Sequence, residues 1–147
     1  EGGVMPIRPE NRGRYPADWK AIRERILRRA LWRCEWPGCK ALHLDVGWWR
    51  GEKFFPMGRA LRDAGAKAGD EIGCFDGTSI RLIKIVLTIA HLDHTPENCA
   101  EENLRAWCQR HHLAYDREHH ARTRHATRKA AAMTADMFDA AAAARGR

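Results

Sequence analysis

The chain has 147 residues, enough for one domain with a modest core and too few for two full domains. It carries 26 Lys and Arg against 19 Asp and Glu, a formal net charge of +7 with its eight His neutral. This excess favours polyanionic partners, nucleic acid first and an anionic membrane surface second, although a basic protein can also be merely soluble. The sequence contains no run of about 18 apolar residues and no basic segment followed by an apolar stretch. We therefore expect a cytoplasmic protein without a membrane span.

The first fifteen residues contain proline, glycine and arginine without apolar periodicity, which is typical of a basic flexible arm. Over residues 16–32 the apolar side chains recur at helical spacing, and Pro16 is well placed just before the first turn of a helix. We expect an amphipathic helix here. Most of its other positions are basic, so this face could contact a phosphate backbone or simply face solvent. The candidate DNA contacts in the helix are Lys20, Arg23 and Arg28.

Residues 40–79 have no clear periodicity, and we interpret them as an insertion with a short helix near residues 57–66. Trp48 and Trp49 stand beside two basic residues within this insertion. They could stack on nucleic acid or wedge into it. Aromatic residues of this kind more often cover a small core, and we favour that alternative.

Residues 80–90 are β-branched or apolar and predict a strand that becomes buried toward its end. A turn follows around Pro96, and residues 101–129 contain few helix breakers, so we expect one or two helices there. The Ala-rich residues after 129 predict a loosely attached helix with Met133, Met137 and Phe138 as docking points. We therefore expect an α+β protein. It divides into an arm of residues 1–15, a domain of residues 16–130 that includes the insertion, and a tail of residues 131–147.

Five Cys is an odd number, and their spacings suit a metal better than a set of disulfides. Cys34 and Cys39 flank a short loop that contains proline and glycine, and Cys108 and His111 are two residues apart at an expected helix start. Three thiolates and one imidazole are a common ligand set for tetrahedral zinc, and a site closed by four protein ligands is structural. For either pair alone, the alternative is a buried reduced Cys.

A second group of polar side chains follows the expected strand. Asp93 and His94 are adjacent, Asn103 comes nine residues after His94, and His112 nine residues after Asn103. Phosphodiester hydrolysis needs an activated water on one side of phosphorus and charge neutralisation of the departing oxygen on the other. An imidazole can supply the first, and a divalent ion held by oxygen and nitrogen ligands the second. Because neighbouring residues of a strand point in opposite directions, Asp93 and His94 could divide these tasks.

These residues, with the Cys pairs, resemble the motif of the HNH endonucleases, a family of metal-dependent DNA-cutting enzymes. The resemblance covers roughly residues 34–39 and 83–116. It implies a ββα-metal core, the His-Me finger fold, in which a β-hairpin and a helix surround one catalytic ion. The basic amphipathic helix would precede this core, and C-terminal helices would follow it.

The resemblance also implies the roles of the site residues. His94 would be the general base, and Asp93 and His112 would hold a divalent ion, Mg²⁺ or Mn²⁺. Asn103 would orient the site by hydrogen-bonding to backbone or to an imidazole, or would approach the ion; an Asn at a helix start can also be an N-cap. Asp116 lies one helical turn after His112 and could be a third ligand or form a surface ion pair.

The sequence departs from the family pattern at one position. The family usually has Cys-x-x-Cys-His, and His111 occupies the place of the second Cys. Cys74 or Cys99 could replace it as a zinc ligand if His111 points elsewhere. His91 could be an auxiliary site residue or DNA contact, and a core His is the favoured alternative.

The implied substrate is double-stranded DNA, with Arg110 and Arg117 as further candidate contacts, in the cytoplasm of a bacterial or phage-infected cell. Two other functions fit the same residues. One is a zinc-stabilised DNA-binding module without cleavage activity. The other is a subunit of a phage packaging or restriction complex whose partner supplies specificity.

Overall fold

In the computed structural model of the protein, residues 9–145 are described, with the side chains of residues 11–126, 128 and 129. The protein is α+β: it combines helices with small antiparallel sheets. It divides into two compact units, with the boundary between His112 and Leu113. This boundary lies inside the domain that we expected over residues 16–130. Residues 1–8 of the expected arm, and residues 146–147 of the expected tail, lie outside the described part.

The first unit begins with two short helical segments. A 3-10 helix, η1 (Pro9–Arg14), occupies the described part of the expected arm, and α1 (Trp19–Arg29) follows. The helix ends earlier than predicted, because Leu31 and Trp32 take left-handed φ angles of 50° and 58°. Leu31 is consequently 74% exposed, so the apolar spacing of α1 does not extend to it.

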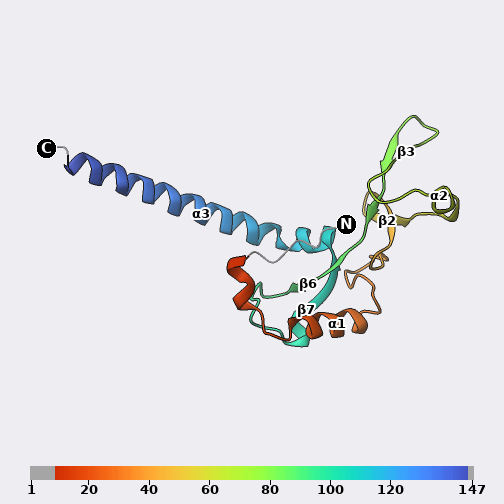
Figure 1. The fold of residues 1–147 in the computed structure, drawn as a ribbon, viewed down its shortest axis with the longest axis horizontal. Helices are drawn as coiled ribbons and strands as arrows, with labels where there is room; N and C mark the ends of the chain where they lie inside the picture. Colours follow the sequence, from red (N-terminus) through yellow and green to blue (C-terminus); the bar gives the residue numbers. More distant parts are fainter. Residues whose placement is uncertain (1–8, 146–147) are drawn as a thin grey trace. The chain divides into compact units, whose positions relative to one another are not determined.

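The centre of the unit is a two-stranded antiparallel sheet formed by β6 (Leu87–His91) and β7 (Leu104–Cys108). In its register, Leu87 pairs with Cys108 and His91 with Leu104. The buried face of α1 packs against both strands (Figure 1). Three apolar side chains of α1 form this face: Ile22, Ile26 and Leu27. The core of the unit therefore lies between α1 and the β6–β7 hairpin.

The prediction of one continuous strand over residues 80–90 is wrong. The segment forms β4 (Ser79–Arg81), β5 (Ile83–Lys84) and β6, which belong to three different sheets. Side chains accept the backbone hydrogen bonds where the strands are interrupted. The N–H of Val86 donates to Gln109 Oε1 and the N–H of Leu87 to His43 Nδ1, each at 3.0 Å. These bonds replace the sheet partners that an uninterrupted strand would have.

The helix predicted after residue 101 begins later than expected. A 3-10 turn, η2 (Glu101–Asn103), leads into β7, and α3 (Gln109–Arg145) starts directly after it. Pairing with β6 therefore overrides the helix-forming residues of this stretch. The result is a strand–strand–helix sequence of β6, β7 and α3.

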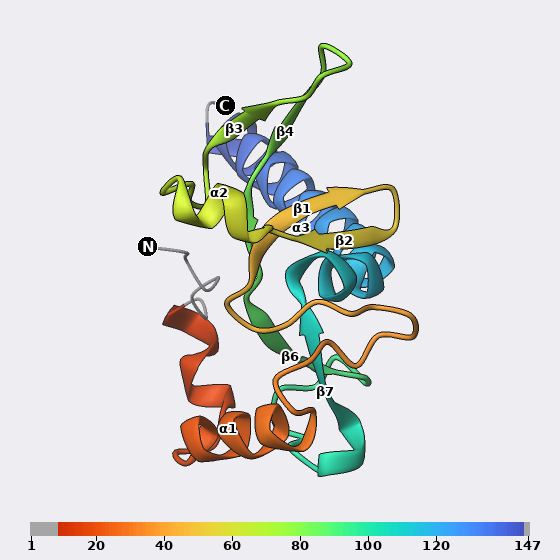
Figure 2. The same ribbon diagram turned by 90° about the vertical axis from the view of Figure 1, so that its right-hand side faces the viewer.

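The inserted segment contains two hairpins and a short helix. In the first hairpin β1 (Val46–Arg50) pairs with β2 (Lys53–Pro56), and β1 also pairs with β5. The helix α2 (Arg59–Asp63) lies within the range predicted for it. The second hairpin joins β3 (Glu71–Gly73) to β4 (Figure 2).

The second unit consists of the rest of α3, from Leu113 onward. The backbone of the expected tail is helical as far as Arg145. The side chains of Met133, Met137 and Phe138 lie outside the described part, so their predicted docking stays a prediction. Among the helices of residues 9–145, none combines the length and apolar character needed to cross a bilayer.

Candidate functional site

The Cys34–Cys39 loop is a turn whose shape follows from its sequence. The N–H of Cys39 donates to the carbonyl of Trp36 at 3.0 Å, with Pro37 and Gly38 between them. Gly38 has a φ of 76°, which a type II turn requires at its third position and which glycine adopts without strain. The N–H of Cys34 donates to the carbonyl of Ala41 at 3.0 Å and closes the base of the loop. The turn thus brings the two thiols to one side of the chain.

The four predicted zinc ligands lie together. One possible ligand atom from each of Cys34, Cys39, Cys108 and His111 lies within 4.8 Å of the other three. His111 Nδ1 is 3.2 Å from the sulfur of Cys108 and 3.7 Å from that of Cys34. Zinc bonds of about 2.3 Å to sulfur and about 2.0 Å to nitrogen place tetrahedral neighbours roughly 3.5–3.8 Å apart. The four residues therefore could hold a metal ion such as structural Zn²⁺, and His111 points toward the three thiols.

Two tryptophans enclose the His111 imidazole. The ring of Trp36 stacks on it with centroids 5.1 Å apart and an interplanar angle of 1°, and Trp49 meets it edge-on at 5.7 Å. The guanidinium of Arg110 lies 4.7 Å over the Trp49 ring. Trp48 stacks on Phe55 at 5.9 Å. Trp48 and Trp49 therefore contact the protein itself, in agreement with the core-covering alternative.

The pKa values of the cluster reflect its burial and its internal hydrogen bonds. The pKa of the Cys34 thiol is raised, first by its hydrogen bond to the side chain of Cys108 and then by burial. The same hydrogen bond lowers the pKa of Cys108. Burial raises the pKa of Cys39 and lowers that of His111. At neutral pH a neutral imidazole suits metal ligation, whereas thiols with raised pKa values must lose protons to an incoming ion.

An ion pair attaches the Cys34 loop to β7. The guanidinium of Arg29 contacts both carboxylate oxygens of Glu35 at 3.0 Å, and it also donates to the carbonyls of Glu101 and Leu104 at 2.7 and 2.8 Å. Glu35 accepts the N–H of Ala106 at 2.7 Å and donates its own N–H to the Ala106 carbonyl at 2.8 Å. These contacts fix the loop on the strand that leads to Cys108.

A second cluster forms in the turn after β6. Asn103 Nδ2 donates to Asp93 Oδ1 at 2.9 Å and to the carbonyl of Asn98 at 2.8 Å, while Asn103 Oδ1 accepts the N–H of Asp93 at 3.2 Å. Asp93 Oδ1 also accepts the N–H of Thr95, and Asp93 Oδ2 accepts Asn98 Nδ2. These donors, the Asn103 amide first, lower the pKa of Asp93 to about 2. Asn103 thus orients the turn through backbone and carboxylate and makes no N-cap.

His94 occupies the middle of this turn. We had expected Asp93 and His94 to point in opposite directions as neighbouring residues of a strand. Both come after the last residue of β6, so strand alternation does not apply to them. His94 has a φ of 56°, in the left-handed region that non-glycine residues rarely adopt and that occurs often at functional sites. Its N–H donates to the carbonyl of His91 at 3.1 Å. The turn geometry, and not strand alternation, sets the direction of the His94 side chain.

His112 is held at the start of α3 by a residue of β6. Thr88 Oγ1 lies 2.7 Å from His112 Nδ1 and 3.3 Å from the carbonyl oxygen of Trp107. When the hydroxyl donates its one hydrogen to that carbonyl, it accepts from Nδ1–H, which places the ring lone pair on Nε2. This arrangement orients the imidazole as neighbours of metal-binding His residues commonly do.

The remaining Cys and His of the predicted site lie elsewhere. Neither Cys74 nor Cys99 belongs to the four-ligand group, and Cys99 lies 3.9 Å from His91 Nε2 instead. His91 is buried and stacks on Trp19 at 5.4 Å, as expected of a core His. Asp116 belongs to the second unit, where its carboxylate is 3.7 Å from His120.

Several candidate DNA contacts bind acceptors of the chain itself. Arg23 donates to the carbonyl of Leu87 at 3.3 Å, Arg28 pairs with Glu24 at 2.6 Å, and Arg110 pairs with Glu52 at 3.2 Å. The other two, Lys20 and Arg117, are exposed.

Sequence reasoning missed three residues that support the two clusters. Thr88 and Arg29 act through contacts with residues distant in sequence, and no local pattern marks them. Asn98 has a local signal, because an Asn in a polar turn after Asp93 is a frequent partner for backbone and carboxylate groups.

Comparison of the chain with protein-family models, with curated proteins and with solved structures gave no match.

Proposed function

We propose that the protein is a metal-dependent endonuclease of the HNH type that hydrolyses phosphodiester bonds in double-stranded DNA. The observation that carries the proposal is the Asp93–Asn103 pairing, which fixes the turn containing His94 between β6 and β7. The helix that follows these strands begins with His112 in its first turn. This strand–strand–helix unit contains the four residues that the resemblance singles out, Asp93, His94, Asn103 and His112, and its order is the one expected for a ββα-metal core.

The Asp93 carboxylate suits a divalent ion chemically. Its low pKa keeps it charged at all physiological pH values. A carboxylate has about four acceptor positions, and three are used by Asn103, Thr95 and Asn98, so one position on Oδ2 remains for a ligand bond. Asp93 and His112 would hold Mg²⁺ or Mn²⁺, which when bound supplies charge neutralisation for the departing 3′ oxygen.

The other steps belong to side chains of the protein. His94 takes a proton from the attacking water, which approaches phosphorus in line with the departing oxygen. Asn103 keeps the His94 turn in place and acts as a positioning residue. Thr88 keeps the His112 ring in one orientation.

In this proposal the Cys3His group holds a structural Zn²⁺. His111 and His112 are adjacent, so the ion that fixes His111 at the start of α3 also fixes the helix end from which His112 projects. Loss of zinc would therefore reduce cleavage without removing any residue of the catalytic turn.

Plasmid cleavage by zinc-loaded protein with added Mg²⁺ or Mn²⁺ tests the proposal. Wild type should convert supercoiled plasmid to nicked or linear DNA, and His94→Ala should not. His125→Ala is a matched control, because it removes an exposed imidazole on α3. Equal activity of wild type and His94→Ala would refute the nuclease proposal.

A zinc-stabilised DNA-binding module without cleavage activity is the second candidate, favoured by the four-ligand group and the net charge of +7. It predicts DNA affinity that falls steeply with salt and no cleavage with any divalent ion.

A further inference from the structure

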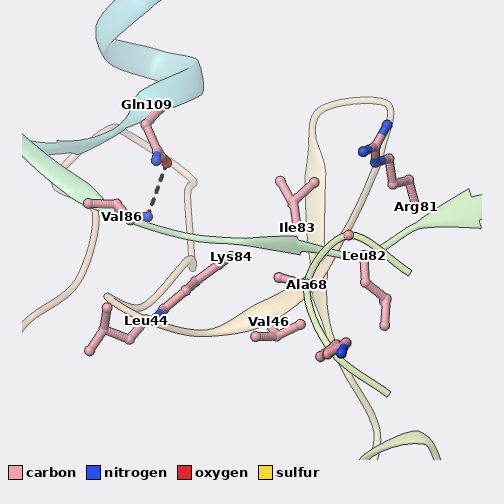
Figure 3. Close-up of a pocket in the computed structure, with 11 residues that line it drawn as sticks. Leu44, Val46, Ala68, Arg81, Leu82, Ile83, Lys84, Val86 and Gln109 are labelled. Atoms are coloured by element: carbon pink, nitrogen blue, oxygen red, sulfur yellow. Dashed lines mark hydrogen bonds between the residues drawn. The ribbon is translucent and has the colours of Figure 1, made fainter. Parts of the chain in front are cut away.

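An open groove lies beside β5, between the first hairpin and the start of α3. It has a volume of about 720 Å³. Figure 3 shows the residues that line it. Its apolar lining includes Val46, Ile83 and Val86, and its polar lining includes three cations: Lys67, Arg81 and Lys84. No carboxylate lines it. The groove therefore combines an aliphatic floor with three basic residues along its edges, and the side chains of Arg81 and Lys84 point to opposite sides of the strand (Figure 3). Such a surface fits an anionic ligand with an apolar part.

The backbone on one side of the groove is held in place. The N–H of Gly69 donates to the carbonyl of Leu82 at 2.7 Å, and the N–H of Leu82 donates to the carbonyl of Asp70 at 2.8 Å. The Asp70 carboxylate accepts the backbone N–H of Lys67 at 2.9 Å. This loop thus fixes the backbone of Lys67 beside the segment that carries Leu82.

The three cations are available to a ligand. Lys67, Arg81 and Lys84 are exposed, and none forms an ion pair with a carboxylate among the described side chains. In contrast, several Arg residues of α1 are engaged with acceptors of the protein. The cations of this groove are therefore less engaged with the protein itself than these residues of the first helix.

The hairpin that supplies Arg81 also carries an exposed aromatic side chain. Phe75 at its tip is fully exposed. The tip has a defined shape, because Asp76 accepts the N–H and hydroxyl of Thr78 at 3.0 and 2.6 Å, and Cys74 donates to the Thr78 carbonyl at 2.7 Å. At about 3.4 Å per residue, three strand residues separate the level of Arg81 from that of Thr78 by roughly 10 Å. This is close to the rise of about three base pairs of DNA.

We propose that the groove and the β3–β4 hairpin form a second DNA contact of this protein. A duplex places its deoxyribose carbons on the aliphatic floor and its phosphates on Lys67 and Lys84 and, across the strand, on Arg81. Phe75 reaches the bases. Backbone phosphates explain the cations, and an aromatic wedge at a rigid tip is a common device for contacting a base step. This inference rests on the proposed function, and it gives the inserted segment a role in substrate binding.

Salt-dependent binding tests the groove. A labelled 20-bp duplex is titrated with zinc-loaded protein without added Mg²⁺ or Mn²⁺, so the measurement does not depend on cleavage. The triple variant Lys67→Gln, Arg81→Gln, Lys84→Gln should lose about 2.7 from the slope of log K against log salt, since each phosphate contact contributes about 0.9. The matched control replaces three exposed cations outside the groove, Arg12, Arg33 and Lys40. This control should keep the wild-type slope.

A second arm tests the hairpin tip. Phe75→Ser should weaken binding about fivefold or more and leave the salt slope unchanged, because stacking on a base does not release counterions. With 2-aminopurine placed along the duplex, wild type should raise the fluorescence at one step, and Phe75→Ser should not. Unchanged affinity and fluorescence in this variant would overturn the placement of the hairpin on DNA.

The outcomes separate the inference from the proposed function. If wild type binds DNA and the groove variant keeps the wild-type slope of log K against log salt, the groove is not a DNA contact. The nuclease proposal is then unaffected. Equal slope losses in both triple variants show a general charge effect and also overturn the groove contact. A groove variant that loses binding to a polyglutamate peptide but not to DNA assigns the groove to an acidic protein partner and overturns it as well. Binding without cleavage refutes only the nuclease proposal.

Discussion

Replacing His111 by alanine removes the one imidazole of the four-ligand group, and the structure sets the size of the expected loss. His111 Nδ1 is 3.2 and 3.7 Å from two of the thiols, so it is placed to complete a tetrahedral site. Structural zinc sites bind with roughly 10–16 kcal/mol, and an equal share for each of four ligands is about 3 kcal/mol. His111→Ala should therefore weaken zinc binding by more than about 100-fold.

Competition with a chromophoric zinc chelator measures this loss, and the absorption spectrum of the Co²⁺-substituted protein reports the ligands. His111→Cys is the informative control, because it supplies a fourth thiolate from the same position. It should retain tight binding and increase the sulfur-to-cobalt charge-transfer band by about one third. Wild-type zinc affinity in His111→Ala would refute the assignment of His111 as a ligand, and with it the idea that zinc fixes the start of α3.

Three further results are expected. The raised pKa values of Cys34 and Cys39 keep these thiols protonated at neutral pH, so zinc must displace their protons. Zinc affinity measured by the same competition should therefore rise from pH 6.5 to pH 8. A pH-independent zinc affinity would contradict the four-ligand cluster. Glu35→Gln should cost about 2 kcal/mol in urea unfolding through loss of its ion pair, and a loss below about 0.5 kcal/mol would count against that anchor. Asn103→Ala should move the NMR titration of the Asp93 carboxyl upward from about 2, since its first-ranked donor is gone, whereas an unmoved midpoint would show that Asn103 does not hold the turn.

The zinc-ligand set could be predicted from sequence because its determinants are local. Pro37 and Gly38 specify the turn between the first two Cys. Cys108 ends β7 and His111 lies in the first turn of α3, so the two residues of the second pair are also close in sequence. The meeting of the two pairs at one site depends on tertiary structure. It depends on the Arg29–Glu35 contacts and on the pairing of β6 with β7, which no short-range pattern encodes.

The errors of prediction share one cause. The stretch that becomes β7 has residues that accept either a helix or a strand, and pairing with β6 decides between them. Similarly, the apolar run before His91 looks continuous, but His43 and Gln109 cap its backbone and divide it into separate strands. The left-handed φ of His94 occurs in a turn whose preceding residue, Asp93, binds Asn103 ten residues further along the chain, and no pattern around His94 indicates that contact.

The central claim is that the turn held by Asp93 and Asn103 presents His94 for phosphodiester hydrolysis. Single-turnover plasmid cleavage by zinc-loaded wild type, His94→Ala and His125→Ala, at matched zinc content and matched circular dichroism, tests it most directly. The account predicts divalent-ion-dependent cleavage by wild type and His125→Ala, and a loss of at least about 100-fold in His94→Ala, the lower end of a general base's contribution. Cleavage by His94→Ala at the wild-type rate, or no cleavage by any of the three proteins, would contradict it.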